Sequence, residues 1–275
     1  MIKSKVIFNI LLLIEMFTFC ACSFHNPKPG KQVWMDDGYT NKVVDGYWLY
    51  LPRTYVSEKD WPIILFLQGG YGSSPNPRTS KEDGPAKYAI DKPGDVELAH
   101  YVKDSFIIIN PHMKVGPSAE RQWYQHAEQL IQILDEVTQQ YSGDRQRLYL
   151  TGLSRGGHGS WELVKKFPDK FAAMIQISGR ITCRSGCDKI ASIPMWIVHN
   201  TGDEVVEYEY AENAVIFFKS DLGISFARIG NTSLTNVQLN SSHIFTSFDN
   251  NGHDAWNRAY TSVDLYRWLL SKKKQ

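Results

Sequence analysis

The clearest pattern along the chain is a series of short, continuously apolar runs separated by polar segments. These runs occupy residues 63–67, 106–109, 148–150, 174–177 and 195–198. An unbroken apolar run is typical of a strand that is buried on both faces of a parallel sheet. Residues 43–51 alternate partly and are rich in aromatic and β-branched side chains up to Pro52, which indicates a further strand.

Helical periodicity appears between these runs. In residues 127–141, apolar side chains recur at spacings of three and four, and a second such segment runs from residue 154 to 167, where Pro168 ends it. A strand at residues 244–248 and a C-terminal helix complete the pattern. Strands that alternate with helices predict an α/β fold with a mostly parallel sheet flanked by helices on both faces.

The first residues have the layout of a secretory signal. Lys3 and Lys5 precede an apolar run at residues 6–14, and small residues and cysteines follow at 20–22. The apolar run is shorter than the roughly 20 residues that a membrane span needs. We therefore expect an exported protein with a signal peptide at 1–21, an N-terminal tether at 22–42 and one folded domain at 43–275.

The four cysteines refine this expectation. The stretch Phe19-Cys20-Ala21-Cys22 resembles a bacterial lipobox, which implies a lipid on Cys22 and a location in the periplasm or on the outer membrane or cell surface. Cys183 and Cys187 are then the remaining cysteines, and an oxidising compartment favours a disulfide between them. Two cysteines without a nearby histidine pair make only half a zinc site, so we expect neither a metal nor a cofactor.

Composition and charge limit the classes of substrate and binding partner that we expect. With 43% hydrophobic residues in 275, the chain can bury one sizeable core. The formal net charge of +1 leaves no basic surplus to attract nucleic acid or anionic lipid. The composition favours a small-molecule or glycan substrate, with membrane contact only through a lipid anchor.

The clearest candidate for a catalytic residue is Ser154. The sequence Gly152-Leu153-Ser154-Arg155-Gly156 stands where a predicted strand turns sharply into a predicted helix, the context of a nucleophile elbow. Glycines flank the serine because side chains would clash in so tight a turn. The alternative role for Ser154 is that of a helix N-cap.

A serine nucleophile needs a base and an acid, in the order serine, acid, histidine for this context. Asp203 follows a buried strand, where open α/β sheets place their sites, with Glu204 and Glu207 as rivals. His253 stands on a polar turn after the last strand, and we expect His199 to brace the acid loop.

An oxyanion requires backbone donors. We expect them from the N–H groups of Arg155 and of Gly70 or Tyr71.

Several of these stretches together resemble a known group of proteins. They are Gln68-Gly69-Gly70, Trp123, Tyr149-Leu150-Thr151-Gly152-Leu153-Ser154, Phe167-Pro168-Asp169, Asp203-Glu204-Val205-Val206 and Gly252-His253-Asp254-Ala255-Trp256. They are similar to bacterial carboxylesterases of the phospholipase/carboxylesterase group, close to polyhydroxybutyrate depolymerases and feruloyl esterases. The resemblance spans about residues 43–270. It implies an α/β-hydrolase fold and a triad of Ser154, His253 and Asp203 that cleaves acetyl, feruloyl or other short acyl esters through an acyl-enzyme.

The chain departs from this group at three places. Gln68 stands where the group has a histidine, and Arg155 replaces a common methionine, which puts a cation at the pocket floor unless the side chain turns away. Residues 222–242 are longer than the group leads us to expect and suggest a lid or rim loop. Trp123 and Trp256 are candidate substrate-binding residues.

Two other functions stay open on the sequence. A serine peptidase of the prolyl-oligopeptidase type uses the same triad on the same fold. A non-catalytic glycan-binding lipoprotein is the second, because a fold alone does not fix function.

Overall fold

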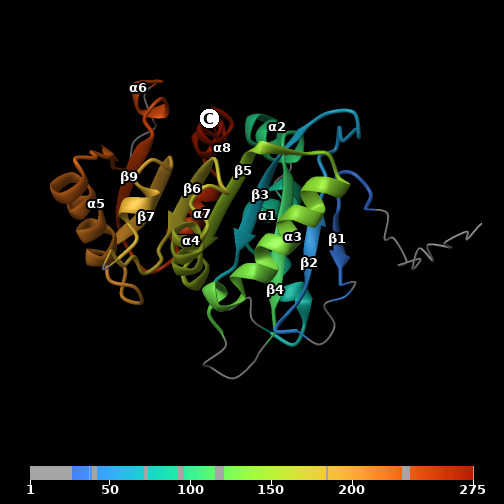
Figure 1. Cartoon of the computed structure of the whole chain (residues 1–275), viewed down its shortest axis with the longest axis horizontal. Coiled ribbons are helices and arrows are strands. Elements are labelled where there is room, and N and C mark those ends of the chain that lie inside the picture. Colours follow the sequence, from blue (N-terminus) through green and yellow to red (C-terminus); the bar gives the residue numbers. More distant parts are fainter. Residues whose placement is uncertain are drawn as a thin grey trace, which may run out of the picture.

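A computed structural model describes residues 27–36, 38, 42–70, 74–91, 96–114, 121–183, 185–230 and 236–274 (Figure 1). The expected signal peptide, the lipidation candidate Cys22 and the oxyanion candidate Tyr71 lie outside the described residues. No helix in the described part of the chain is long and apolar enough to cross a membrane.

One sheet of nine strands organises the molecule, in the order β1-β2-β4-β3-β5-β6-β7-β9-β8. β1 pairs antiparallel with β2 and β2 antiparallel with β4, and the other neighbours are parallel. The strands are β1 Gln32–Met35, β2 Val44–Tyr50, β3 Trp61–Leu67, β4 Ile107–Met113, β5 Gly143–Leu153, β6 Ala173–Ile177, β7 Met195–Gly202, β8 Ala227–Ile229 and β9 His243–Asn251.

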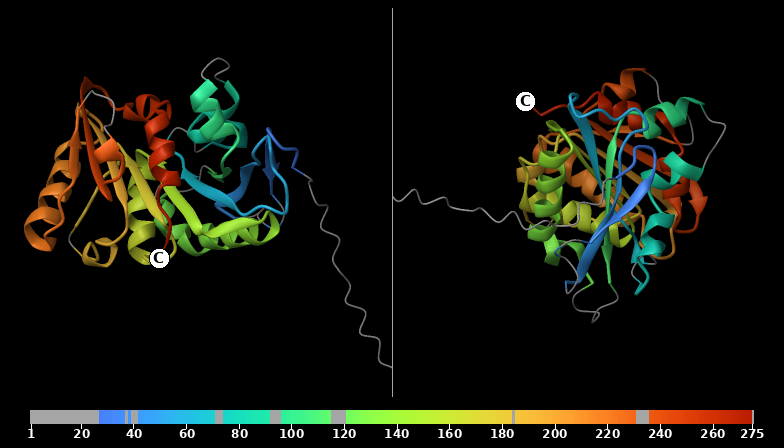
Figure 2. Two further views of the ribbon diagram at one scale, coloured as in Figure 1. Left: turned by 90° about the horizontal axis from the view of Figure 1, so that it is seen from above. Right: turned by 90° about the vertical axis from the view of Figure 1, so that its right-hand side faces the viewer.

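Helices cover both faces of this sheet (Figure 2). α3, α4 and α5 pack on one face, and α1, α2, α7 and α8 pack on the other. The helices are α1 Pro85–Asp91, α2 Val96–Lys103, α3 Ala127–Gln140, α4 Arg155–Lys166, α5 Glu209–Leu222, α6 Asn236–Leu239, α7 Ala255–Tyr260 and α8 Val263–Leu270. Short 3-10 turns lie at Pro77–Glu82, Trp123–His126 and Asp188–Ile190.

The continuous apolar runs reach a core on each face of the sheet. In β3, Ile63 and Leu65 belong to the cluster beneath α3 and α4, whereas Ile64 and Phe66 belong to the cluster beneath α1, α2 and α8. Successive side chains of a strand point to opposite faces, so a strand covered on both sides needs apolar residues throughout. The predicted α/β-hydrolase architecture with its mostly parallel sheet is confirmed.

The first strand corrects the predicted tether. Residues 32–35 fall within the segment 22–42, yet they form β1 and extend the sheet beside β2. Trp34 packs against Trp48 with ring centroids 5.4 Å apart, and Met35 is 7% exposed. This short edge strand is held by aromatic packing that a four-residue pattern does not reveal.

The long segment at 222–242 is also not a lid in its described part. Gly223 ends α5 in the left-handed conformation, with φ of 70°, and the chain then forms β8 at the edge of the sheet. Phe226 packs on Phe218 and His243, with ring centroids 5.6 Å and 5.1 Å apart. These apolar contacts draw the segment onto the sheet edge, and residues 231–235 lie outside the described part.

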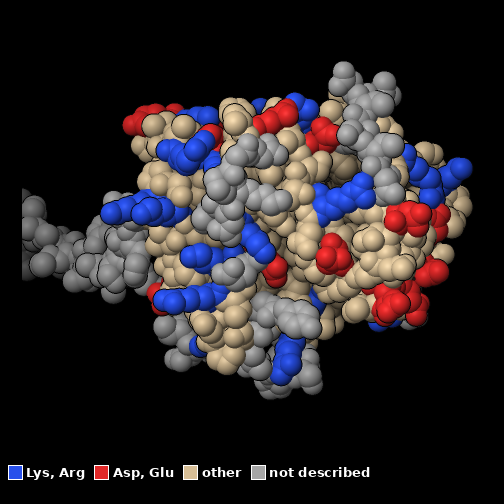
Figure 3. All heavy atoms as spheres, turned by 180° about the vertical axis from the view of Figure 1, so that it is seen from behind, with Lys and Arg blue, Asp and Glu red and all other residues tan. Residues whose placement is uncertain are grey.

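Surface charge is mixed. Figure 3 shows basic and acidic side chains interspersed over the back face, in keeping with the formal net charge of +1.

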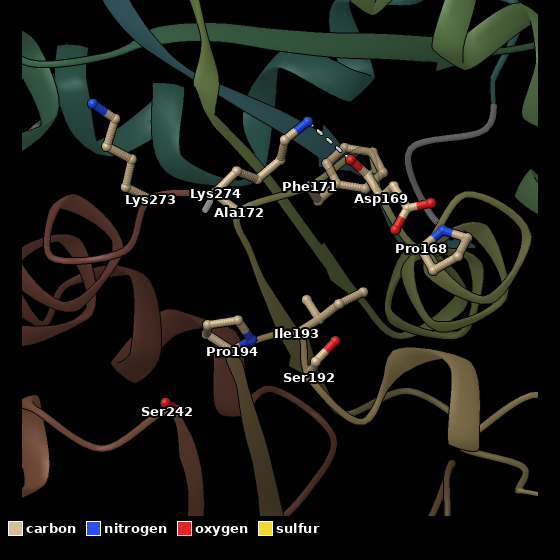
Figure 4. Close-up of a pocket in the computed structure, with 10 residues that line it drawn as sticks. All are labelled: Pro168, Asp169, Phe171, Ala172, Ser192, Ile193, Pro194, Ser242, Lys273 and Lys274. Atoms are coloured by element: carbon tan, nitrogen blue, oxygen red, sulfur yellow. Dashed lines mark hydrogen bonds between the residues drawn. The ribbon is translucent and has the colours of Figure 1, made fainter.

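A cavity of about 450 Å³ lies at the N-terminal ends of β6, β7 and β9 (Figure 4). Ser154 lies at the other edge of the sheet, after the C-terminal end of β5. Its walls come from the segments just before β6, β7 and β9 and from the C-terminus, where Lys274 Nζ donates to the Asp169 carbonyl oxygen at 2.9 Å. Lys273 points away from this contact in the same view. None of its described lining residues belongs to the site described next.

Candidate active site

Ser154 occupies a strained turn between β5 and α4. Its φ of 54° and ψ of −119° lie in a region that residues other than glycine rarely adopt. The Ser154 N–H donates to the Ile177 carbonyl oxygen at 2.9 Å, which ties the turn to β6. A Cβ at position 156 would come within 1.8 Å of the Leu67 carbonyl oxygen, so the turn requires glycine there. The elbow pattern in the sequence thus reflects real backbone crowding.

Three residues far apart in the sequence meet at this turn. Ser154 Oγ lies 2.7 Å from His253 Nε2, and His253 Nδ1 lies 2.8 Å and 3.0 Å from the two carboxylate oxygens of Asp203. A carboxylate beside Nδ1 accepts its proton, which leaves Nε2 free to accept the serine proton. The arrangement can therefore activate a hydroxyl nucleophile.

The Asp203 carboxylate is held on every side. Its Oδ1 accepts hydrogen bonds from the backbone N–H groups of Val205 and Val206, at 2.9 Å and 3.0 Å. His199 Nε2 lies 3.2 Å from Oδ2, and the Asp203 side chain is fully buried. These donors satisfy a buried charge and fix its orientation toward His253.

His199, in the second half of β7, braces the acid loop as expected. Its Nε2 lies 2.8 Å from the Val206 carbonyl oxygen as well as near Asp203, so Nε2 carries a proton that it donates to these acceptors. Burial lowers the pKa of His199 below its usual value, which favours the neutral ring. A neutral His199 donates a hydrogen bond that stabilises the Asp203 carboxylate. It carries no positive charge that would compete with a protonated His253 for that carboxylate.

The loop after β3 lies against the elbow. A Cβ on Gly69 would be 2.6 Å from Leu153 Cδ1 and 3.5 Å from Ser154 Cβ, so the backbone of this loop lies close to the elbow. Trp123 Nε1 donates to the Gln68 carbonyl oxygen at 2.9 Å, and the Arg155 guanidinium donates to the Gly69 carbonyl oxygen at 3.0 Å. The backbone N–H groups of Gly70 and Arg155 remain the candidate oxyanion donors.

Trp123 does not fit the substrate-binding role predicted for it. Its side chain is 0% exposed and lies in the core, and its Nε1 donates to the Gln68 carbonyl oxygen beside the site. Because its ring also packs closely on Gly159 of α4, it holds the oxyanion loop and the elbow helix together.

An apolar cleft of about 830 Å³ opens on the His253 side of Ser154. We call it the apolar cleft; its lining is Gly69, Gly70, Asp83, Leu153, Ser154, Val205, His253, Asp254 and Trp256. The predicted binding residue Trp256 lies in this wall and meets the His253 ring edge to face, with centroids 5.1 Å apart.

A second cavity of about 420 Å³ meets Ser154 from another side. We call it the cation pocket; its lining is Gln122, Tyr124, Ser154, Arg155, His158, Arg180 and Val206. Burial and the like charge of Arg121 lower the pKa of Arg155 to about 10, so its guanidinium is still charged at neutral pH. Sequence analysis singled out Arg155 but neither Arg180 nor His158 as pocket residues.

The predicted pair Cys183 and Cys187 is a disulfide, with the Cα atoms 5.4 Å apart. It closes part of the loop that follows β6 and carries Arg180. Trp161 Nε1 of α4 donates to the Thr182 carbonyl oxygen at 3.1 Å, which fastens the same loop to the helix behind Ser154. Among the described residues, no group of three histidine, cysteine, aspartate or glutamate side chains is placed to hold a metal.

Sequence comparison gives one short match to a protein of known activity. A segment of 111 residues, 40% of the chain, is 29% identical to the bifunctional acetylxylan esterase/xylanase XynS20E of Neocallimastix patriciarum. The match spans 16% of that protein. No family model matches the chain.

Solved structures match over most of the chain. A thermostable esterase has a TM-score of 0.66 and 20% identity, with 88% of this chain and 63% of that one aligned. The CE1 ferulic acid esterase AmCE1/Fae1A of Anaeromyces mucronatus has a TM-score of 0.61 and 18% identity, with 88% and 89% aligned. The chain therefore shares the α/β-hydrolase fold with these esterases, although it spans less than two thirds of the first.

Proposed function

We propose that this chain is a serine hydrolase that cleaves a carboxylic ester through an acyl-enzyme. The observation that carries the proposal is the hydrogen-bonded series from Ser154 Oγ through His253 to Asp203, with the serine on a positive-φ turn at the start of a helix. Each residue stands where its role requires: the nucleophile is exposed to two cavities, the base contacts it and a buried acid orients the base.

The chemical steps follow from this geometry. His253 Nε2 takes the Ser154 proton as Oγ attacks the ester carbonyl, and the oxyanion accepts hydrogen bonds from the Arg155 and Gly70 N–H groups. The tetrahedral intermediate collapses, and the leaving alkoxide takes the proton from His253. His253 then deprotonates a water that attacks the acyl-enzyme, which releases the acid and restores the serine. Asp203 stabilises the imidazolium in both halves of the reaction.

The similar proteins support an ester substrate of this kind. The sequence match names an acetylxylan esterase, and the ferulic acid esterase of Anaeromyces mucronatus has also been solved with ferulic acid bound. The apolar cleft has the volume and the aromatic wall for a small organic group. We propose acetyl, feruloyl or other short acyl esters, free or on a glycan, as the substrate class.

A fluorophosphonate probe tests the proposal because it phosphonylates only an activated serine. We expect a mass increase of one probe adduct on the peptide that contains Ser154, together with turnover of nitrophenyl acetate. Ser154→Ala removes both, whereas the exposed Ser192→Ala at the far cavity keeps both. Label that persists in folded Ser154→Ala contradicts the assignment, and faster turnover of aminoacyl naphthylamides than of esters indicates a peptidase instead.

We also propose that the protein is exported and anchored through lipid on Cys22. The layout of residues 1–22 supports this, and so does the Cys183–Cys187 disulfide, because such bonds persist in oxidising compartments. Cell fractionation checks it: the full chain is expected with the membranes, and Cys22→Ser is expected to lose the lipid and the membrane association. Recovery of both forms in the cytoplasm contradicts export.

A further inference from the structure

The two cavities that meet at Ser154 differ in charge. The apolar cleft is lined by two carboxylates, Asp83 and Asp254, and by apolar side chains. The cation pocket is lined by Arg155, Arg180 and His158, and no carboxylate is among its described lining residues. A substrate that occupies both cavities therefore meets opposite electrostatic environments at its two ends.

Arg180 is placed to bind a group in the cation pocket. Its guanidinium lies over the Tyr210 ring, with Cζ 5.0 Å from the centroid, and a guanidinium held in this way still has N–H groups that can bind an anion. It is exposed, and no carboxylate of the described residues forms an ion pair with it. His158 Nδ1 donates to the Arg180 carbonyl oxygen at 2.9 Å and so fixes the backbone from which the side chain projects.

The cation pocket holds a second guanidinium, that of Arg155. Arg155 lies half-buried beside Ser154, and the nearby Arg121 has the same charge. A carboxylate in the pocket would accept charge-assisted hydrogen bonds from guanidinium groups.

The position of His253 indicates which part of an ester enters the cation pocket. His253 must protonate the leaving alcohol, so the alcohol lies on the His253 side of Ser154. His253 lines the apolar cleft and is absent from the described lining of the cation pocket. The acyl part, on the other side of the scissile bond, is then the part that faces Arg180.

We infer that the cation pocket selects esters whose acyl part carries a free carboxylate. The inference rests on the proposed ester hydrolysis and narrows its substrate class to half-esters of dicarboxylic acids and other acidic acyl groups. Arg180 acts as a specificity-determining residue, and Arg155 contributes charge while it holds the oxyanion loop.

Matched esters that differ only in charge test this. Ethyl hydrogen adipate carries the carboxylate on the acyl part, and its neutral isostere ethyl adipamate carries an amide there. A second pair, 4-acetoxybutanoate and 4-acetoxybutanamide, places the same groups on the alcohol part. We expect the kcat/KM ratio of charged to neutral ester to be about ten or more for the first pair, as a charge-assisted hydrogen bond supplies. For the second pair we expect a ratio of one or less, because Asp83 and Asp254 line the cleft that receives the alcohol part.

Variants test whether Arg180 causes the preference for a charged acyl part. Arg180→Gln is expected to lower the first ratio about tenfold, and Arg180→Lys is expected to keep part of it because the charge remains. Arg145→Gln is the matched control, since it removes the same charge from an exposed position at the start of β5. Added salt should lower the wild-type ratio.

The outcomes separate this inference from the proposed function. A first ratio near one with good turnover of the neutral esters overturns the inference and leaves ester hydrolysis standing. A higher ratio for the second pair, or equal effects of Arg180→Gln and Arg145→Gln, overturns it as well. If no ester is turned over, the proposed function fails, and tighter binding of ethyl hydrogen adipate than of ethyl adipamate to Ser154→Ala still measures the selectivity of the pocket.

Discussion

Arg155 and Gly69 are joined by a hydrogen bond of 3.0 Å, from the guanidinium of the residue after the nucleophile to the carbonyl oxygen of the loop after β3. The bond links the start of α4 to the segment that carries the Gly70 N–H. It gives Arg155 a structural role that an apolar side chain at this position would not fill. The arginine lines the cation pocket and at the same time holds the oxyanion loop.

Loss of this bond should slow the chemical step. Arg155→Met is expected to lower kcat on a neutral ester by about tenfold, because loosened donors stabilise the oxyanion less well, while removal of a donor outright costs about 10²–10³-fold. Steady-state kinetics on nitrophenyl acetate measure this, with Arg145→Met as the control for lost charge. An effect on KM alone speaks against a role in holding the oxyanion loop.

Asp203 is expected to determine the tautomer of His253. In Asp203→Asn the amide oxygen can still accept from Val205 and Val206, but the amide NH₂ then faces His253 Nδ1. Nδ1 must become the acceptor, the proton moves to Nε2, and Nε2 can no longer take the serine proton. We expect kcat to fall about 10⁴-fold with little change in melting temperature.

The exposed Asp249→Asn on β9 is the control for this change. A loss smaller than tenfold in Asp203→Asn would move the acid role to Glu204 or Glu207, the rivals on the same loop.

His199 is a positioning residue, and its effect should depend on a donor at Nε2. His199→Phe removes the donor to Val206 and Asp203, so we expect kcat to fall about tenfold at constant KM and the acidic limb of the pH–rate profile to shift. His199→Gln, whose amide can donate from a similar place, is expected to restore part of kcat and the profile. Equal losses in both variants with an unshifted profile would indicate only a packing role.

Stability should fall in mild acid because of His243. Burial lowers the pKa of His243 to about 4, from the usual value near 6.5. Between these pH values the unfolded chain binds a proton that the folded chain does not. The free energy of unfolding therefore falls as pH drops through this window, by up to about 1.4 kcal/mol per pH unit for this group.

Urea unfolding at pH 4.5, 5.5, 6.5 and 7.5 measures this slope. His243→Asn is expected to flatten the dependence of the unfolding free energy on pH. His100→Asn, at an exposed position, is expected to leave this dependence unchanged. An identical slope in His243→Asn would assign the acid sensitivity to other groups, of which the buried His199 is the first to test.

The sequence predicts the centre of the fold better than its edges. Continuous apolar runs locate β3, β6 and β7 because central strands are buried on both faces. The elbow pattern is recognisable in the sequence because the crowded backbone at positions 152 and 156 requires glycine. β1 and β8 were not predicted, since three or four residues carry too little periodicity.

The unpredicted parts of the site depend on long-range contacts. The cation pocket combines Tyr124, Arg155 and Arg180 from three separate segments, and none of them stands in a recognisable motif with the others. The partner of Arg155 is a carbonyl oxygen 86 residues away, and a main-chain acceptor carries no residue signature. Ser154, Asp203 and His253 could be selected in advance because their order along the chain follows from the topology of the sheet.

The Cys183–Cys187 bridge has a consequence for how the protein responds to reductant. A disulfide that joins residues only four positions apart restricts the unfolded chain little, so its reduction should hardly move the thermal transition. The bridge does restrict the loop that presents Arg180. Reductant is therefore expected to relax the choice between charged and neutral acyl groups in a protein that stays folded, and parallel melting curves and kcat/KM ratios with and without dithiothreitol would separate the two effects.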